Sequence, residues 1–189
     1  MLNLVFLPVT APGDVTYGSV PKEIAGQDAV IRDVSYPGLV WYNASVREEA
    51  IKQIRNWEIS SLVLVGFSKS GLGAWNIARE IPGLVRATII FDAPVGRETP
   101  AWEIDTFYCD ATSWQADLPM RTVQAFADAL PRSHQLVLIS GDGYHEEMSS
   151  LSLELNTAGL DHVFLPRPHM KHHWNSGWIE EGVNALVDT

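Results

Sequence analysis

The sequence predicts an α/β fold, a three-layer sandwich in which helices cover both faces of a mostly parallel sheet of roughly six strands. Short apolar runs rich in Val and Ile alternate with stretches of helical or loop character, as in successive βαβ units. Several runs are apolar almost throughout, which is typical of strands buried on both faces. The runs are residues 2–9, 29–34, 62–67, 87–93, 135–140 and 162–166.

The stretches between these runs predict the helices. In residues 43–57, Ser45 and Glu48 have the spacing of a capping box, and an apolar face follows at helical period. Proline or glycine near the ends of other stretches indicates where helices stop. The further predicted helices are 21–25, 70–81, 120–130, 145–160 and 177–187.

Length and composition predict one domain, residues 1–189. Hydrophobic residues make up 46% and charged residues 19%, which is an ordinary globular balance. Residues 93–134 are longer than a crossover between parallel strands needs, and long loops are often functional. We therefore expect this segment to form a small partial cover over a site. Its aromatic residues are equally consistent with packing of the segment onto the core.

Charge and cysteine content limit the partners. The net charge of −10 repels phosphate backbones, which argues against nucleic acid. Cys109 is the only cysteine, so the chain has no internal disulfide. The first 12 residues lack a basic segment and their apolar run is short, so they predict a strand and neither a signal peptide nor a membrane span. We expect a cytoplasmic protein without a membrane partner; the sequence leaves the oligomeric state open.

Residues 66–71, Gly-Phe-Ser-Lys-Ser-Gly, directly follow a predicted buried strand and precede a predicted helix. A phosphate-binding P-loop would need Lys and then Ser or Thr directly after its second glycine, but Gly71 is followed by Leu72. A dinucleotide fingerprint starting at Gly71 would need a third glycine where Asn76 stands. The remaining chemical interpretation is a nucleophile elbow, a sharp turn that exposes Ser68 between small residues at positions 66 and 70.

A nucleophilic serine needs a base, and the base needs an orienting carboxylate. Asp142 comes two residues after the run 135–140, where a strand would end. Three histidines, His169, His172 and His173, follow the last predicted strand. Asp92 and Asp33 also stand at strand ends, where we expect them to serve as hydrogen-bonding residues.

With these features the chain resembles the α/β-hydrolase superfamily, particularly its small carboxylesterase-like members. The resemblance covers nearly the whole chain, as a minimal version of the fold. His172-His173-Trp174 is similar to the end of several esterase families, which favours His172 over His173 as the base. The resemblance implies Ser68 as nucleophile and Asp142 as acid, with Glu146 as the alternative carboxylate.

The resemblance also implies two backbone donors for the oxyanion. The first is the N–H of Lys69, directly after the nucleophile. The second belongs to the loop after the first strand. Pro8 and Pro12 carry no N–H, and Thr10 matches the donor position.

These residues predict a serine hydrolase that cleaves a small carboxylic ester, or a thioester or amide, through an acyl-enzyme. No cofactor is implied, and the expected partner is a small-molecule ester. One alternative is a non-catalytic binding protein of the same fold. Another is a metal-dependent hydrolase that uses the histidines of 169–173, with Glu146 and Glu147 as further ligands.

Overall fold

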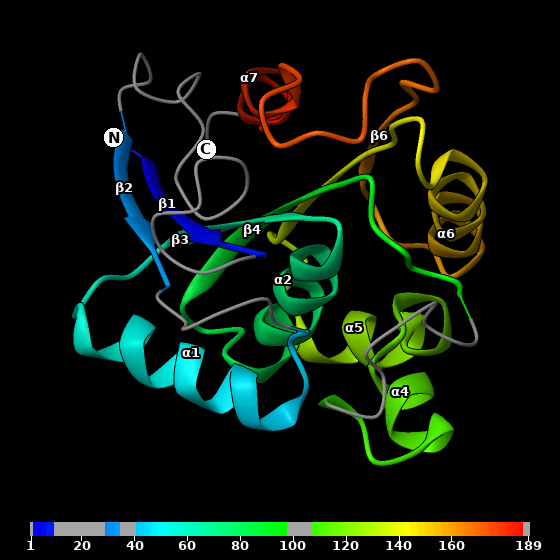
Figure 1. The fold of residues 1–189 in the computed structure, drawn as a ribbon. Helices are drawn as coiled ribbons and strands as arrows, with labels where there is room; N and C mark the ends of the chain where they lie inside the picture. The colour runs from blue at the N-terminus through cyan, green and yellow to red at the C-terminus, as the bar shows by residue number, and fades with distance from the viewer. Residues whose placement is uncertain (1, 10–28, 35–40, 98–106, 187–189) are drawn as a thin grey trace.

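The computed structural model describes residues 2–9, 29–34, 41–97 and 107–186. In this part of the chain, six strands form one sheet in the order β2-β1-β3-β4-β5-β6 (Figure 1). All five strand pairings are parallel, which confirms the predicted fold class. The strands are β1 (Leu2–Leu7), β2 (Ala29–Asp33), β3 (Leu62–Phe67), β4 (Val85–Phe91), β5 (Gln135–Ile139) and β6 (Val163–Leu165).

Five α-helices coincide with predicted ones, and their ends shift by a few residues. They are α1 (Ala44–Asn56), α2 (Lys69–Glu80), α5 (Val123–Ala129), α6 (His145–Thr157) and α7 (Trp178–Asn184). The sequence did not predict α4 (Ala111–Asp117) or the 3₁₀ turn η2 (Pro119–Arg121). The predicted short helix at 21–25 lies outside the described residues.

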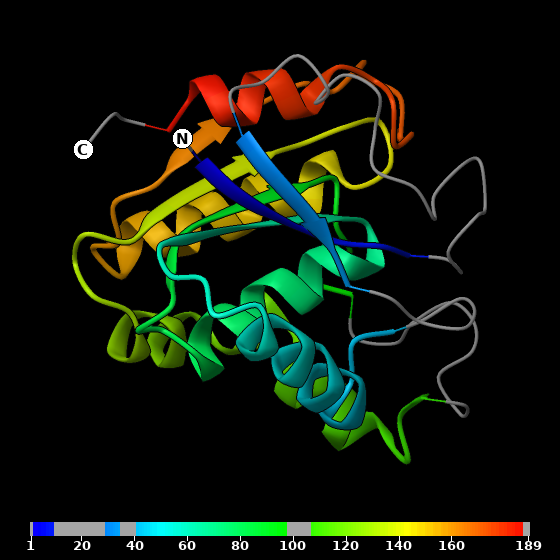
Figure 2. The same ribbon diagram turned by 90° about the vertical axis from the view of Figure 1, so that its left-hand side faces the viewer.

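Helices lie on both faces of the sheet, so the described elements form three layers (Figure 2). Alternate residues of one strand point to opposite faces. In β1, Val5 and Leu7 join the larger apolar cluster with α1, α2 and α6, whereas Leu4 and Phe6 pack in the cluster of α7. Burial of both sets explains why the strands read as continuous apolar runs.

Part of the predicted cover segment packs against α1 and α2. Trp114 of α4 is fully buried, and its ring lies edge-on to Trp41 with ring centroids 5.1 Å apart. Arg47 of α1 binds Asp117 at the end of α4, with nitrogen and oxygen 2.6 Å apart, and both side chains are nearly buried. These contacts favour the interpretation that the aromatic residues anchor the segment. Whether it covers a site stays a prediction, because residues 98–106 lie outside the described part.

No helix within the described ranges is long and apolar enough to cross a membrane.

His134 directly precedes β5, at the amino-terminal end of that strand, and packs between β4 and α5. Its Nε2 lies 3.2 Å from Oγ1 of the buried Thr88, and its Nδ1 lies 3.3 Å from the carbonyl of Val85. Burial disfavours the charged imidazolium and lowers the pKa of His134 to about 4. The hydrogen bond to Val85 opposes this shift only in part.

We expect the pKa of His134 to make the fold acid-sensitive. Between pH 6.5 and 4 the unfolded chain binds a proton at this site and the native protein does not, so the free energy of unfolding falls as the pH falls through this window. The loss should reach about 2–3 kcal/mol by pH 4. Urea unfolding of the wild type and of His134→Gln measures the difference. If the free energy of unfolding changed equally with pH in the two proteins between pH 6.5 and 4.5, the lowered pKa of His134 would be contradicted.

Candidate active site

The carboxyl ends of β3, β4 and β5 lie side by side at one edge of the sheet. Phe67 pairs with Phe91, and Phe91 with Ile139, so the next residue of each strand stands at the same level. Two backbone hydrogen bonds continue this register beyond the strands. The N–H of Ser68 donates to the carbonyl of Phe91 at 3.0 Å, and the N–H of Asp92 donates to the carbonyl of Ile139 at 2.8 Å. Ser68 and Asp92 therefore emerge next to each other.

The turn between β3 and α2 has the geometry of the predicted elbow. Ser68 has φ 52° and ψ −124°, a conformation that L residues rarely adopt. Gly66 allows the turn because the backbone comes back very close to it. A Cβ at Gly66 would lie 2.4 Å from the carbonyl oxygen of Ser70. Ser68 itself is partly exposed at the tip of this turn.

Ser70 stands where the usual elbow pattern has glycine, and its side chain closes the turn from inside. The fully buried Oγ accepts the N–H of Phe67 at 2.9 Å and donates to the carbonyl of the same residue at 2.9 Å. The close contact between the start of α2 and the end of β4 is made by Gly71 and not by residue 70. A Cβ there would lie 2.7 Å from Cβ of Ala93. Serine at position 70 thus supports the elbow.

Lys69 begins α2, so its backbone N–H belongs to the helix's first turn, whose donors lack intrahelical acceptors. The side chain does not extend into solvent. Lys69 is only 4% exposed, and its ammonium lies 4.9 Å from the ring centroid of Trp41. A cation over the face of an indole is electrostatically favourable.

Asp92 is a fully buried carboxylate that accepts hydrogen bonds on both oxygens. Oδ1 accepts the N–H groups of Gly141 and Tyr144, both at 2.8 Å, and Oδ2 accepts that of Gly143 at 2.9 Å. Burial of a charge requires compensation of this kind. The turn that follows β5 therefore forms a binding site for the side chain that follows β4.

The two glycines of this turn are required by the closeness of the carboxylate. A Cβ at Gly141 would lie 2.5 Å from Oδ2 of Asp92. A Cβ at Gly143 would lie 2.8 Å from the same oxygen and 2.8 Å from Nδ1 of His172. No side chain fits at either position without displacing this pair.

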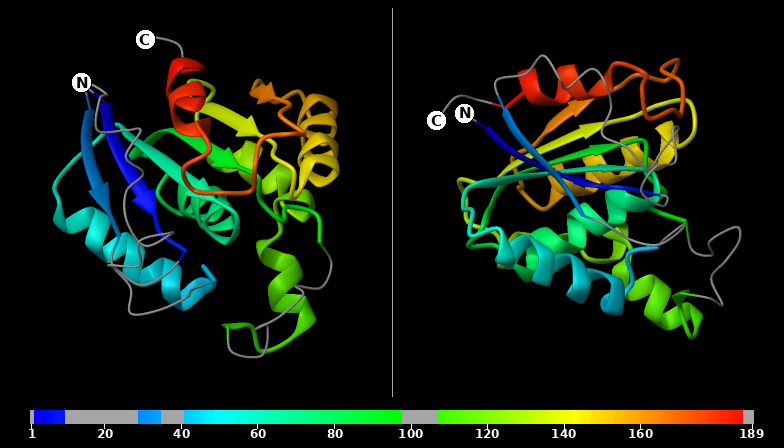
Figure 3. Two further views of the ribbon diagram at one scale, coloured as in Figure 1. Left: turned by 45° about the horizontal axis from the view of Figure 1, so that its top comes forward. Right: turned by 60° about the vertical axis from the view of Figure 1, so that its left-hand side comes forward.

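The imidazole of His172 faces Asp92, with Nδ1 2.7 Å from Oδ2. Because an ionised carboxylate only accepts, Nδ1 carries the proton and Nε2 keeps its lone pair in the neutral ring. The ring lies between two aromatic side chains, with centroids 4.6 Å from Phe67 and 5.4 Å from Tyr144. The segment between β6 and α7 brings it back to the carboxyl edge (Figure 3).

Asp142 lies just after β5, as the sequence predicted, but its carboxylate binds the backbone of the histidine loop. Its Oδ1 accepts the backbone N–H of His172 at 2.6 Å, and its Oδ2 binds Nζ of Lys171 at 2.9 Å. These bonds lower the pKa of Asp142, the lysine contributing most. The carboxylate thus holds the backbone of the histidine loop, while the ring is oriented by Asp92. Asp92 serves as the expected hydrogen-bonding residue at its strand end, and it also contacts the imidazole of His172. The available signal in the sequence was the pair of glycines around Asp142.

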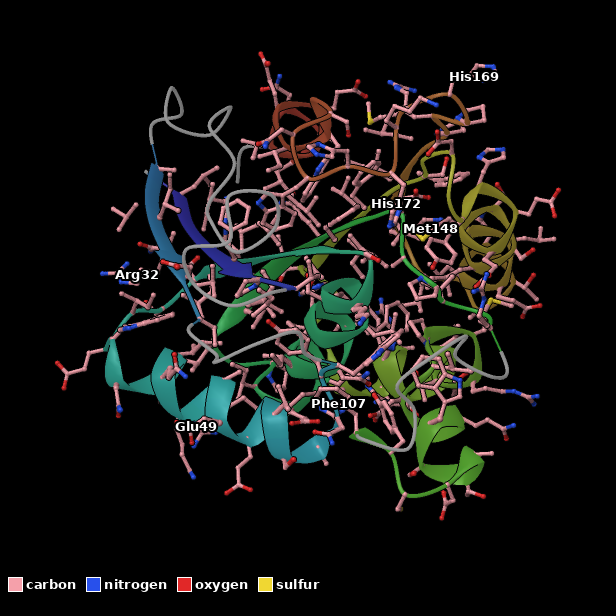
Figure 4. All side chains as sticks on the ribbon, viewed as in Figure 1. Arg32, Glu49, Phe107, Met148, His169 and His172 are labelled. Carbon is pink, nitrogen blue, oxygen red and sulfur yellow. The ribbon has the colours of Figure 1, made fainter. Side chains whose placement is uncertain are left out.

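The other histidines lie apart from this pair. His169 is exposed and lies at the outer edge of the molecule, away from His172 (Figure 4). The Nδ1 of His173 accepts the N–H of Asn175 at 3.1 Å. Among the described residues, no group of three or more His, Cys, Asp or Glu side chains is arranged to hold a metal ion.

The remaining predicted site residues lie on α6 or outside the described part. Glu146 is exposed in the first turn of α6, and the structure records no contact between it and His172. Glu147 binds the N–H of Gly96 at 2.9 Å. Thr10, the second predicted oxyanion donor, lies outside the described residues, so its role stays a prediction.

The elbow predicts a stability effect at Ser70. Ser70→Ala removes the acceptor of the buried Phe67 N–H, so we expect the free energy of unfolding to fall by about 1–3 kcal/mol. Ser150→Ala, at an exposed serine of α6, serves as the control and should change stability by less than about 0.5 kcal/mol. Urea denaturation followed by circular dichroism makes the comparison. Equal effects of the two substitutions would show that the hydroxyl of Ser70 does not stabilise the turn.

No protein-family model matches the sequence. No curated protein matches it either.

Solved structures are similar over nearly the whole chain. MPT51 of Mycobacterium tuberculosis superimposes with a TM-score of 0.71 at 10% identity, over 96% of this chain and 86% of that one. Est1E of Butyrivibrio proteoclasticus superimposes with a TM-score of 0.63 at 10% identity, over 96% of this chain and 84% of Est1E. An extracellular α/β-hydrolase from a Paenibacillus species superimposes with a TM-score of 0.60 at 14% identity, and the match covers 100% of both chains. The chain therefore has the α/β-hydrolase fold.

Proposed function

We propose that the protein is a serine hydrolase that cleaves a small carboxylic ester through an acyl-enzyme. The observation that carries the proposal is the contact between the buried carboxylate of Asp92 and the partly exposed imidazole of His172, at the strand ends where the turn exposes Ser68. A serine on a strained turn, a neutral imidazole and an orienting carboxylate are the parts that acyl transfer requires. The extracellular α/β-hydrolase from a Paenibacillus species, which has the same fold, is consistent with hydrolytic chemistry.

In the proposed reaction, Nε2 of His172 takes the proton of Ser68 Oγ as that oxygen attacks the carbonyl carbon. The tetrahedral intermediate collapses when the imidazolium gives its proton to the leaving alkoxide. Water then attacks the acyl-enzyme with the same base and releases the acid. Throughout, the carboxylate of Asp92 accepts from Nδ1 and stabilises the charged imidazolium.

The developing oxyanion requires donors fixed in advance. The backbone N–H of Lys69 belongs to the first turn of α2, where the helix dipole also favours negative charge. We assign it as the first donor. Thr10 is retained as the proposed second donor.

The nucleophile is tested by covalent labelling. We expect a fluorophosphonate probe to modify the wild type once, at Ser68, and peptide mass spectrometry locates the site. Ser68→Ala should lose labelling and at least about 10³-fold of the turnover of short-chain aryl esters, because only binding and oxyanion donors remain. Ser150→Ala is the matched control. A folded wild-type protein that resists the probe and hydrolyses no ester would instead be a binding protein of this fold.

The acid is tested by two aspartate substitutions. Asp92→Asn should lower kcat by about 10⁴-fold, because a neutral amide neither stabilises the imidazolium nor enforces its tautomer. Asp142→Asn keeps an oxygen for the N–H of His172 and loses only the contact with an exposed lysine, so its cost should stay below about tenfold. Steady-state kinetics at neutral pH, with circular dichroism to check folding, decides between them. The opposite ranking would return the acid role to Asp142.

A further inference from the structure

Arg97 lies five residues beyond Asp92, on a segment that other elements hold in place. The N–H of Gly96 donates to Oε2 of Glu147 on α6 at 2.9 Å. The indole N–H of Trp114 on α4 donates to the carbonyl of Arg97 at 2.9 Å. Because the backbone is fixed from both sides, the arginine side chain starts from a defined position near the carboxyl edge of the sheet.

The guanidinium lies one aromatic ring away from the proposed base. Its central carbon is 5.3 Å from the ring centroid of Tyr144, the distance of a cation–π contact. The same ring contacts the imidazole of His172 edge-on, with centroids 5.4 Å apart. The ring of Tyr144 thus contacts both the guanidinium of Arg97 and the imidazole of His172.

The charge of Arg97 is only loosely compensated. Its Nε lies 3.7 Å from Oε1 of Glu147, and the arginine side chain is 41% exposed. Such a partly exposed pair contributes little binding energy. The contact with Glu147 is made by Nε and not by the terminal amino groups of the guanidinium. These groups present the planar fork that binds carboxylates with two parallel hydrogen bonds.

The negative net charge of the protein bears on what Arg97 can bind. A net charge of −10 repels anionic ligands at long range, so the binding of an anionic substrate would depend on a local cation. We propose that Arg97 is a specificity-determining residue and that the preferred esters carry a carboxylate at a distance from the scissile bond. This inference rests on the proposed serine-hydrolase function and specifies its substrate class.

The test uses esters that differ only in the remote carboxylate. The 4-nitrophenyl monoester of adipate is compared with 4-nitrophenyl hexanoate for a carboxylate on the acyl side, and 4-acetoxybenzoate with 4-methylphenyl acetate for one on the alcohol side. We expect the wild type to prefer the anionic member of at least one pair in kcat/KM. Arg97→Gln should lower that preference by about 10–100-fold, mainly through KM.

Two controls make the result specific to the guanidinium. Arg97→Lys should retain part of the preference, because it keeps the charge and loses the fork. Arg132→Gln, at an exposed arginine near the opposite ends of the strands, should leave the ratio unchanged. Titration of the same esters against Ser68→Ala, followed by tryptophan fluorescence, reports binding without turnover.

The outcomes separate the two proposals. Hydrolysis of the neutral esters with no loss of anionic preference in Arg97→Gln overturns the role of Arg97 and leaves the serine-hydrolase proposal standing. Absence of hydrolysis with every ester contradicts the proposed function. In that case the titrations still test Arg97, and equal affinities for the anionic and neutral esters would overturn its role as well.

Discussion

The carboxylate of Asp92 is the group around which the candidate site is organised. It is a buried charge, and such a charge persists only when hydrogen bonds replace its hydration. Three backbone N–H groups of the turn after β5 supply them, and His172 approaches one of the same oxygens. One turn therefore fixes the carboxylate of Asp92 through its amides. The same turn holds His172, because Asp142 within it accepts the N–H of His172.

The fold could be predicted because the strongest signals in the sequence are also the strongest physical constraints. Strands covered on both faces must be apolar throughout, and each of the six runs is a strand. The elbow was readable for a similar reason: Gly66 stands where any Cβ would meet the backbone of Ser70. By contrast α4 is short and capped by Asp110 and Ser113, a local hydrogen-bonding pattern that resembles a turn in the sequence.

The sequence could not show which aspartate contacts the ring of His172, because β4 and β5 are adjacent strands. Parallel strands lie about 4.8 Å apart, so side chains that follow either strand reach the same region. The sequence favoured Asp142 as the acid and gave Asp92 only the role of a strand-end hydrogen-bonding residue. What separates them is their partners: the carboxylate of Asp92 contacts the imidazole of His172, whereas that of Asp142 binds the backbone N–H of His172 and the ammonium of Lys171. Glycine on both sides of Asp142 was the available indication, since glycine marks close approach by another group.

Ser70 shows how the elbow accommodates a departure from its usual pattern. The positive φ of Ser68 costs on the order of 1–3 kcal/mol, which the surrounding contacts must offset. A glycine at position 70 would contribute no side chain to that task. The serine hydroxyl instead satisfies both polar groups of Phe67, whose ring in turn contacts His172. The residue that departs from the pattern therefore links the strained turn at Ser68 to the placement of His172.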